Sequence, residues 1–586
     1  MRNRISILLL IAMISTSCQD FLKEEMVSGI SYEYYNTEKG IESLVWASYA
    51  PLRAFGGTES GVRMSNFGTD LWQSTSVSSG NEFHVYTSEI GPANSNFSAL
   101  WTNFYKGINS CNIAINRIPD IAGESTLRTQ EGKNKRLGEV KFLRAYYYFV
   151  LVQSFGKAPL LLDENISAIR EIKRASVAEI YKAIIADLTF SANYLPAVQP
   201  DYARPTQSAA QHLLAKVYLT RGSAVAEDRG QKNTDMDSAA YFAEKVIAFK
   251  DGLLADYDAV RGWQNEKNKE ALFSVQYSTD RLINGTGSEM GRVYTIQYET
   301  VAGLQPSLEY GLPYVRLRPT EYFYDLYNRK NDSRFYKSFN TAWLCNRGDN
   351  IPKWTASDAP KPELVGKARF AIGDTALYVS MNPDIPAGQV GGKPYLWLPR
   401  NKFTTRLFPQ YKYHLDPRKT NVNDQNGTLD FTLMWLGETY LIAAEAHGRN
   451  KNYQSAVKFI NVVRSRAAYK QGEAKPKQFY LVEGGAFSEL TTGTGNKMLI
   501  TEDKINSFEK LRDFILEERA RELGGDNDRW FDLVRTETFL NRVKALNPIA
   551  APLVKSFHKL RPIPQEHIDR IENGGPIAEE QNEGYF

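Results

Sequence analysis

The sequence is poor in the residues that build metal and disulfide centres. It holds three cysteines and six histidines in 586 residues. Three cysteines are too few for a disulfide framework. The histidines lack the His-x-x-x-His or Cys/His spacing of a zinc site, so we predict no bound metal. A phosphate-binding glycine loop and a Gly-x-Ser-x-Gly elbow are also missing from the sequence, and we predict neither a cofactor nor a catalytic residue.

Dense basic blocks and long apolar runs are scarce as well. The formal net charge is only +4, and the Lys and Arg residues are spread along the chain, so nucleic acid is excluded as a partner. After the first 17 residues, no segment is long and apolar enough to cross a bilayer. With 42% hydrophobic and 24% charged residues the composition is that of a globular protein.

The one strongly apolar stretch lies at the N-terminus. Arg2 and Arg4 precede an apolar run of about ten residues, too short to span a membrane, and small residues then lead to Cys18. This pattern predicts a secretory signal over residues 1–17, acylation of the Cys18 thiol and a spacer over residues 18–36. An ordinary signal followed by an incidental cysteine is the alternative. Cys111 and Cys345 then remain, either paired or as buried free thiols.

Aromatic residues are abundant, with 33 Tyr, 29 Phe and 9 Trp making up 12% of the chain. Most of them are expected in the core, since aromatic rings bury large areas. The same rings suit carbohydrate, because the apolar C–H face of a pyranose stacks on a flat ring while neighbouring amides and carboxylates bind its hydroxyl groups.

The patterning predicts a mostly α-helical protein with one mature domain over residues 37–586. A helical part (37–250) and a second helical part (431–586) flank a loop-rich insertion (251–430) with a few short strands. Repeated helix pairs with short turns indicate a tetratricopeptide-like scaffold. The main helices are expected over residues 37–55, 97–118, 133–155, 177–195, 208–222, 237–249, 431–447, 453–467, 508–523 and 528–540.

Several segments, taken in order, resemble the SusD/RagB family of outer-membrane lipoproteins of Bacteroidetes-type bacteria. Each segment is short, but together they run through nearly the whole mature chain. They are residues 18–22, 141–149 with Gly156 and Pro159, 209–219, 438–446 with 460–467, 515–523 with 529–535, and 560–565 with 582–586.

This resemblance implies both a fold and a function. Family members are helical scaffolds of tetratricopeptide-like pairs with loops placed around them. They cap a SusC-like TonB-dependent transporter, bind nutrient ligands (usually glycans) outside the cell and are not enzymes. We therefore expect a lipid-anchored glycan-binding protein on the outer face of the outer membrane, with that transporter as its partner.

Two irregular regions supply the candidate ligand-binding residues, since loops on a rigid scaffold usually carry binding. Residues 66–96 are rich in Ser, Gly and Asn, and a long irregular segment of this kind is usually functional. The first candidates are Asp70, Trp72, Asn81 and Phe83, with Trp72 as a stacking platform. The second cluster lies in the insertion and comprises Tyr298, Tyr310, Tyr314, Arg316 and Trp343. The alternative to ligand binding, for each of these aromatic rings, is burial against the helices.

Three other functions remain open at this stage. The first is a binding protein of the same kind whose cargo is a peptide or another nutrient, as in RagB-like members. The second is a surface glycosidase, which needs two carboxyl groups about 5 to 9.5 Å apart, and no local motif supports it. The third is a structural lid without a ligand site, in which Trp72 is an interior residue. The charged helix around Glu517 and Arg521 is expected to form ion pairs rather than an acid–base site.

Overall fold

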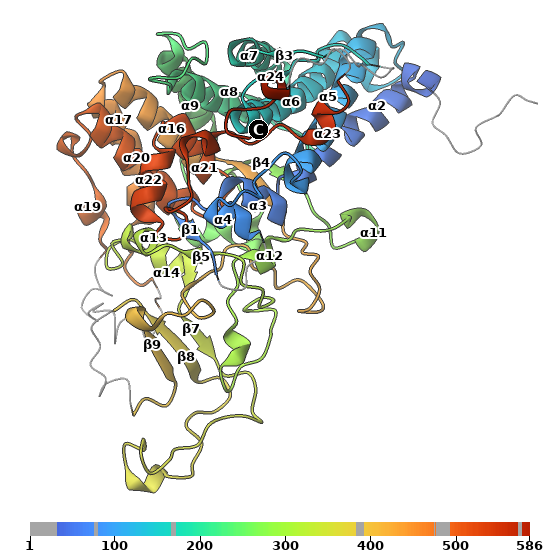
Figure 1. Cartoon of the computed structure of the whole chain (residues 1–586). Coiled ribbons are helices and arrows are strands. Elements are labelled where there is room, and N and C mark those ends of the chain that lie inside the picture. The colour runs from blue at the N-terminus through green and yellow to red at the C-terminus, as the bar shows by residue number, and fades with distance from the viewer. Residues whose placement is uncertain are drawn as a thin grey trace, which may run out of the picture.

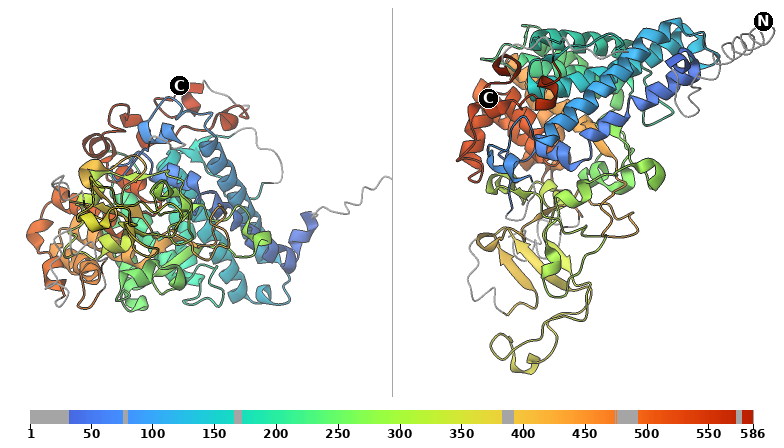
Figure 2. Two further views of the ribbon diagram at one scale, coloured as in Figure 1. Left: turned by 90° about the horizontal axis from the view of Figure 1, so that it is seen from below. Right: turned by 45° about the vertical axis from the view of Figure 1, so that its right-hand side comes forward.

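A computed structural model describes residues 32–75, 80–165, 172–382, 392–473, 475, 493–571 and 577–585. The predicted signal and Cys18 lie outside these described residues. The fold is mostly helical, with short strands, as predicted (Figure 1). The helices gather at one end of the molecule, while the strands and loops of the insertion extend from the other end (Figure 2).

The N-terminal helical part consists of helices that pack on their neighbours in sequence. Thr37 caps the first of them by accepting a hydrogen bond from the Gly40 N–H, and Ser176 with Glu179 forms a capping box. A short 3-10 helix, η1 (Tyr32–Asn36), precedes them. The helices are α2 (Glu38–Ala47), α5 (Ser95–Arg117), α6 (Gln130–Phe155), α7 (Val177–Tyr194), α8 (Gln207–Gly222) and α9 (Asp235–Lys250).

The C-terminal part confirms two predicted helices and corrects two others. Helices α17 (Tyr453–Ala467) and α20 (Phe508–Leu523) are found as expected. The apolar run at 431–447 is not one helix. Its first five residues are strand β11 (Phe431–Trp435), which pairs antiparallel with β4 (Ala271–Val275), and helix α16 (Leu436–Arg449) begins only there. A short run that is apolar on all sides fits a buried strand as well as a helix, so periodicity alone misassigned it.

The helix expected over residues 528–540 is divided into α21 (Arg529–Arg535) and α22 (Phe539–Leu546). At the break Glu537 has a φ of 55°. Its carboxylate accepts hydrogen bonds from the backbone N–H groups of Val225, Ala226 and Glu227. This long-range contact stabilises a turn that the local sequence does not predict.

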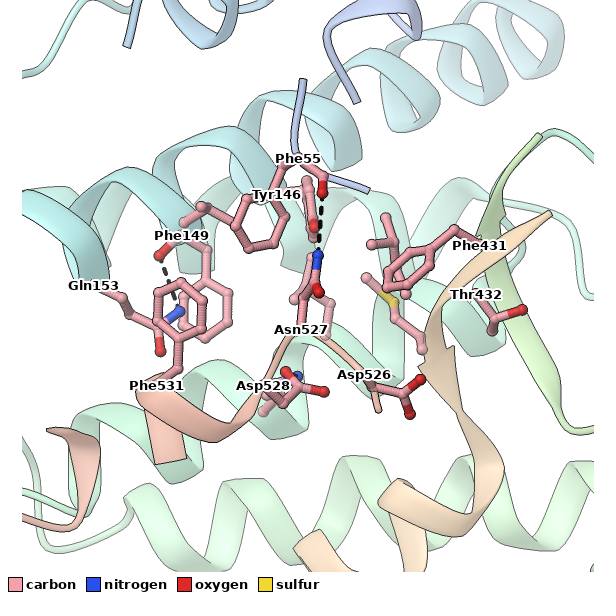
Figure 3. Close-up of a pocket in the computed structure, with 15 residues that line it drawn as sticks. Phe55, Tyr146, Phe149, Gln153, Phe431, Thr432, Asp526, Asn527, Asp528 and Phe531 are labelled. Carbon is pink, nitrogen blue, oxygen red and sulfur yellow. Dashed lines mark hydrogen bonds and ion pairs between the residues drawn. The ribbon is translucent and has the colours of Figure 1, made fainter. Parts of the chain in front are cut away.

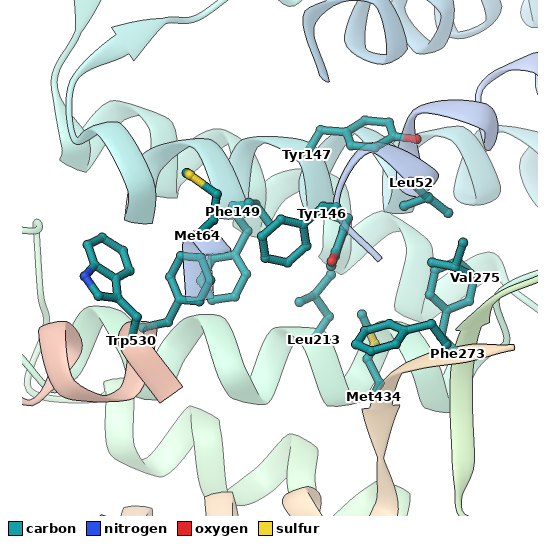
Figure 4. Packing of buried hydrophobic residues seen from close by; sticks show 14 of the residues in the cluster. Leu52, Met64, Tyr146, Tyr147, Phe149, Leu213, Phe273, Val275, Met434 and Trp530 are labelled. Atoms are coloured by element: carbon teal, nitrogen blue, oxygen red, sulfur yellow. The ribbon is translucent and has the colours of Figure 1, made fainter. Parts of the chain in front are cut away.

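One continuous hydrophobic core joins the two helical parts. Tyr146, Tyr147 and Tyr148 are all buried in it, as expected from the sequence. Figure 4 shows Tyr146 and Tyr147 on α6 with Leu213 of α8 nearby and Phe273 and Met434 on the facing strands. The Tyr147 hydroxyl donates to the Ser48 carbonyl, 2.5 Å away, so its polar atom is also satisfied.

The insertion has a second, smaller core of its own. A three-stranded sheet of β7 (Ala342–Leu344), β8 (Thr375–Ser380) and β9 (Leu396–Pro399) supports it, with β7 antiparallel and β9 parallel to β8. The other strands form two-residue pairs: β1 (Trp72–Gln73) with β5 (Arg318–Pro319), β2 (Ala158–Pro159) with β3 (Arg174–Ala175), and β6 (Phe339–Asn340) with β10 (Gln410–Tyr411).

Short helices complete the structure. They are α3 (Glu59–Ser65), α4 (Asn81–Val85), α10 (Tyr257–Arg261), α11 (Arg281–Asn284), α12 (Met290–Val293), α13 (Glu321–Asp325), α14 (Arg334–Ser338), α19 (Gly495–Met498), α23 (Gln565–Ile568) and α24 (Ile577–Glu580). Cys111 and Cys345 are buried free thiols. Within the described ranges, no helix has the length and hydrophobicity that crossing a bilayer requires.

Candidate functional site

Trp72, the first candidate for a sugar platform, is a core residue. Its side chain is fully buried, and its indole N–H donates to the Gly524 carbonyl at 2.8 Å. The rings of Tyr294, Phe323 and Tyr411 surround it, with centroids 4.9, 5.2 and 5.7 Å away. A ring without an exposed face cannot stack on a pyranose, so the structure contradicts this assignment and favours the alternative of a loop anchor.

Asp70 is also unavailable to a ligand. Its carboxylate is fully buried and accepts hydrogen bonds from Arg529 at 2.6 and 2.7 Å and from Arg542 at 2.9 Å. Burial alone would raise the pKa of Asp70, but the two guanidinium groups hold that pKa below its ordinary value. Asp70 therefore fixes the loop after α3 to the C-terminal helices.

The four other buried candidates are packing residues as well. Phe83 packs on Phe97, with ring centroids 5.4 Å apart. Tyr298, Tyr310 and Trp343 belong to the core of the insertion. The hydroxyl groups of the two tyrosines also make internal contacts: that of Tyr298 donates to the Gly311 carbonyl at 2.6 Å, and that of Tyr310 accepts from the Leu344 N–H at 2.9 Å. These residues support the insertion rather than contact a ligand.

Asn81, Tyr314 and Arg316 are the sequence candidates that reach the surface. Asn81 is exposed and accepts a hydrogen bond from the Ser74 hydroxyl at 3.2 Å. Tyr314 is partly exposed, and two guanidinium groups lie against its ring, that of Arg316 at 3.9 Å from the centroid and that of Arg292 at 4.8 Å. Cation–π contacts of this kind hold both arginines in place.

A carboxylate at the centre of this cluster organises the arginines. Glu59 contacts Arg63 at 2.6 Å, Arg316 at 3.2 Å and Arg292 at 3.5 Å. Sequence reasoning missed Glu59, Arg63 and Arg292. The i, i+4 spacing of Glu59 and Arg63 was a signal for one ion pair, but nothing local indicates that Arg292 joins them.

The backbone is strained between Tyr314 and Arg316. Val315 is a buried β-branched residue with a φ of 53°, in the left-handed region, a conformation that costs about 1–3 kcal/mol. It is fixed on both sides, since its N–H donates to the Thr295 carbonyl at 3.2 Å and its carbonyl accepts from the Thr75 hydroxyl at 3.1 Å. Strain of this kind gathers at functional sites, which marks the segment that presents Tyr314 and Arg316.

A polar pocket of about 150 Å³ adjoins this cluster. Gln425 connects the two, because its amide oxygen accepts a hydrogen bond from Arg292 while Asp424 and Asn426 beside it line the pocket. Hydroxyl, amide and cationic groups converge there from two loops, and they include Thr279, Asn284, Arg418, Lys419, Thr420 and Asn426. We call the pocket together with Arg292, Tyr314 and Arg316 the insertion face.

A second cavity lies inside the scaffold and is not a ligand site. Figure 3 shows it between α6, β11 and the turn that carries Asp526, Asn527 and Asp528. Asn527 donates to the Phe55 carbonyl at 3.1 Å across it. Its volume of about 40 Å³ has room for water but not for a sugar ring.

Two family models match the chain. The first, described as starch-binding and associating with the outer membrane, matches residues 20–219. The second, that of the SusD family, matches residues 269–585, more than half of the chain. The chain belongs to the SusD/RagB family. The resemblance found in the sequence motifs is thereby confirmed, and the family's description associates it with starch binding and with the outer membrane.

Individual relatives agree with this membership. SusD-like protein P2 of Formosa agariphila is 25% identical over 530 residues, which cover 88% of this chain and 87% of that protein. The starch-binding protein SusD of Bacteroides thetaiotaomicron is 26% identical over 171 residues, 29% of each chain.

Solved structures share the fold. A SusD homologue from Bacteroides thetaiotaomicron aligns with a TM-score of 0.66 at 19% identity and covers 93% of this chain and 97% of its own. A laminarin-binding SusD-like protein aligns with a TM-score of 0.62 at 21% identity and covers 94% and 100%. The SusD fold therefore extends over the helical scaffold and the insertion together.

Proposed function

We propose that this protein is a non-catalytic glycan-binding lipoprotein of the cell surface, which captures oligo- or polysaccharide and delivers it to a SusC-like TonB-dependent transporter. The observation that carries the proposal is the match of the N-terminal third of the chain to a family described as starch-binding and associated with the outer membrane. Acylation of Cys18 would anchor the chain, and the protein would raise the local ligand concentration without breaking a bond.

The insertion face is the proposed glycan site. A carbohydrate presents many hydroxyl groups and needs donors and acceptors at close spacing, which the polar pocket supplies from two loops. The ring of Tyr314 and the guanidinium groups of Arg292 and Arg316 lie beside it, already oriented by Glu59. Preorganised groups lose little conformational entropy on binding.

The three arginines around Glu59 also give a reason to keep the peptide alternative. A guanidinium group binds a carboxylate in a bidentate fashion, so the terminal carboxylate of a peptide would suit the same face. A glycan array compared with a peptide panel on the same purified protein distinguishes the two cargoes.

Calorimetry against starch, laminarin and other polysaccharides tests the site. The double variant Tyr314→Ala/Asn426→Ala is expected to weaken binding of the recognised glycan at least tenfold, about 1.4 kcal/mol, with an unchanged melting temperature. Tyr194→Ala removes an exposed aromatic ring from the end of α7, far from the insertion in sequence, and is the control. Full affinity in the double variant would remove the insertion face from the proposal, and turnover in a reducing-sugar assay would contradict a non-catalytic role.

Anchoring and the transporter need a separate experiment. In the native cell, Cys18→Ala is expected to release the protein from the outer membrane, and co-purification of the wild-type chain is expected to recover a TonB-dependent transporter. A stable complex should bury well over 1,000 Å². A variant that stays membrane-bound without an acyl group would contradict the lipid anchor.

A further inference from the structure

A second groove lies on the helical scaffold, beside α5 and α23, and shares no lining residue with the polar pocket of the insertion. Its volume of about 340 Å³ falls within the range of small-molecule sites, roughly 300–1,000 Å³. We call it the α5 groove. The residues that matter for its chemistry are Trp101, Tyr105, Lys106, Asn109, His567 and Arg570.

Aromatic rings form one wall of the α5 groove. Trp101 packs against Tyr105 with centroids 5.0 Å apart and against the imidazole of His567 at 4.8 Å. The Tyr105 hydroxyl donates to the Pro159 carbonyl at 2.8 Å, which holds the ring in place. Trp101 is almost fully buried, whereas Tyr105 is partly exposed. A flat ring is therefore presented to the groove on a rigid backing.

Two polar groups that line the α5 groove lack a hydrogen-bond partner among the residues that the structure describes. The side-chain Oδ1 of Asn109 accepts from the backbone N–H of Asn165 at 3.2 Å, and the side-chain NH2 group has no acceptor among the described residues. The Nε2 atom of His567 is buried and has no hydrogen-bond partner in the described part of the chain. Burial, together with Arg174 and Arg570, lowers the pKa of His567 to about 4, so the ring is neutral at pH 7. A buried polar atom of this kind is stabilised by a ligand that supplies the missing hydrogen bond.

The charged residues that line the α5 groove in the described part of the chain are all basic. Among the described residues that line it there is no Asp or Glu, while Lys106 and Arg570 both contribute. Lys106 has no ion-pair partner among the described residues. Within the described ranges, Arg570 pairs only with Glu566 at 3.6 Å, and both of these side chains are largely exposed to solvent, where such pairs contribute little. An anionic ligand group would find two available cations.

We propose that the α5 groove binds an acidic sugar unit, a pyranose that carries a carboxylate. The apolar face of the sugar would lie on the Tyr105 ring, its carboxylate would meet Lys106 and Arg570, and its hydroxyl groups would bond to the Asn109 amide and to His567 Nε2. This site is additional to the polysaccharide site of the insertion face and does not depend on it.

Calorimetry with digalacturonate and with the neutral disaccharide galactobiose tests the proposal on the purified protein. Digalacturonate is expected to bind at least tenfold more tightly than galactobiose, and the difference should shrink as NaCl is raised, because salt screens exposed charges. The variant Lys106→Gln/Arg570→Gln should bind both sugars alike. Lys182→Gln, on the exposed side of α7, is the control and should keep the wild-type preference.

A blocking variant separates this groove from the insertion face. Asn109→Trp should abolish digalacturonate binding while leaving polysaccharide binding intact, and Tyr314→Ala/Asn426→Ala should do the reverse. Three results would each overturn the proposal. Digalacturonate does not bind, both disaccharides bind with equal affinity, or digalacturonate binding is lost only in the Tyr314→Ala/Asn426→Ala variant. If only polysaccharide binding fails, the result contradicts the proposed function and does not affect the proposal for the α5 groove.

Discussion

One cluster of ion pairs in the helical scaffold and one ion pair in the insertion lie in opposite environments. In the scaffold, Arg519 of α20 is almost fully buried between Glu438 of α16 at 2.8 Å and Asp532 of α21 at 2.6 Å. In the insertion, Arg347 and Asp349 form an ion pair at 2.6 Å in which both side chains are largely exposed. The first contact fixes three helices relative to one another, whereas the second leaves its groups in water.

The aromatic residues differ between the regions in a related way. The scaffold rings join one continuous core that also takes in many rings of the insertion. A smaller core of the insertion alone contains the rings of Tyr298, Tyr310, Trp343, Phe370 and Phe408. In both regions the large rings chosen from the sequence are used for packing. Polar loop residues and the partly exposed Tyr314 are left to form the accessible face of the insertion. The difference teaches that aromatic abundance in this chain reports on its cores, and that polar groups held by those cores form the face proposed for recognition.

The largest expected effect comes from removing a buried charge of the scaffold. Arg519→Met leaves Glu438 and Asp532 with fewer partners in a buried setting, and we expect the free energy of unfolding to fall by about 5 kcal/mol. Urea denaturation followed by circular dichroism measures it. Arg347→Met is the matched change in the insertion and should leave the denaturation midpoint unchanged; equal losses in the two variants would remove the contrast between the regions.

Trp72→Ala should destabilise the protein by about 4 kcal/mol, because it leaves a cavity among Tyr294, Phe323 and Tyr411. The same denaturation experiment measures it. A variant with wild-type stability and weakened glycan binding would restore Trp72 as a ligand platform.

Trp343→Ala should act locally, because its core is separate from that of the scaffold. Limited proteolysis is expected to cleave within residues 296–408 first and to spare the helical parts. Simultaneous loss of both regions would mean that they unfold as one unit.

Acid should weaken the folded protein between about pH 6.5 and pH 4. Burial disfavours the charged imidazole and lowers the pKa of His84 and His558 to about 3 and of His414 to about 4, from an ordinary 6.5. As the pH falls through 6.5, the unfolded chain takes up protons that the folded chain does not, so stability declines. Asp430 and Asp528, whose pKa burial raises to about 6, oppose this decline in the same pH range. Melting temperatures measured from pH 7 to pH 4.5 should fall, and a flat or rising profile would contradict the account.

The smallest expected effect concerns a helix cap. Ser176→Ala removes the side chain that accepts from the Glu179 N–H at 3.3 Å at the start of α7, and we expect a loss of about 1 kcal/mol. Ser176→Asp preserves an N-cap acceptor and should retain most of the stability. Equal losses in the two variants would show that the cap is not responsible.

The sequence was informative where structure is local. Helical periodicity located α17 and α20, and the capping box marked the start of α7, because these features depend on neighbours three or four residues apart. It was uninformative where distant segments meet. Asp70 was assigned to a ligand, yet its partner Arg529 lies 459 positions away. The strand at 431–435 likewise depends on its pairing with residues 271–275, which the run itself does not encode.

The candidate site divides in the same manner. Asn81, Tyr314 and Arg316 were chosen because polar and aromatic residues in irregular segments favour binding. All three reach the surface, Tyr314 and Arg316 within the insertion face, and their role in binding stays a prediction. Arg292, Glu59 and the polar pocket were missed, since the pocket is assembled from loops around residues 278–285 and 418–428. Burial of Trp72 or Trp343 could not be predicted either, because a single ring in a loop carries no periodic pattern.

The central claim is that the insertion presents a glycan-binding face on a scaffold that performs no chemistry. Calorimetry of the wild-type protein, Tyr314→Ala/Asn426→Ala and Tyr194→Ala against a bound polysaccharide tests it most directly. The account predicts a loss of affinity of at least tenfold in the first variant alone, with the polysaccharide recovered intact. Undiminished binding by that variant, or a shortened polysaccharide, would contradict it.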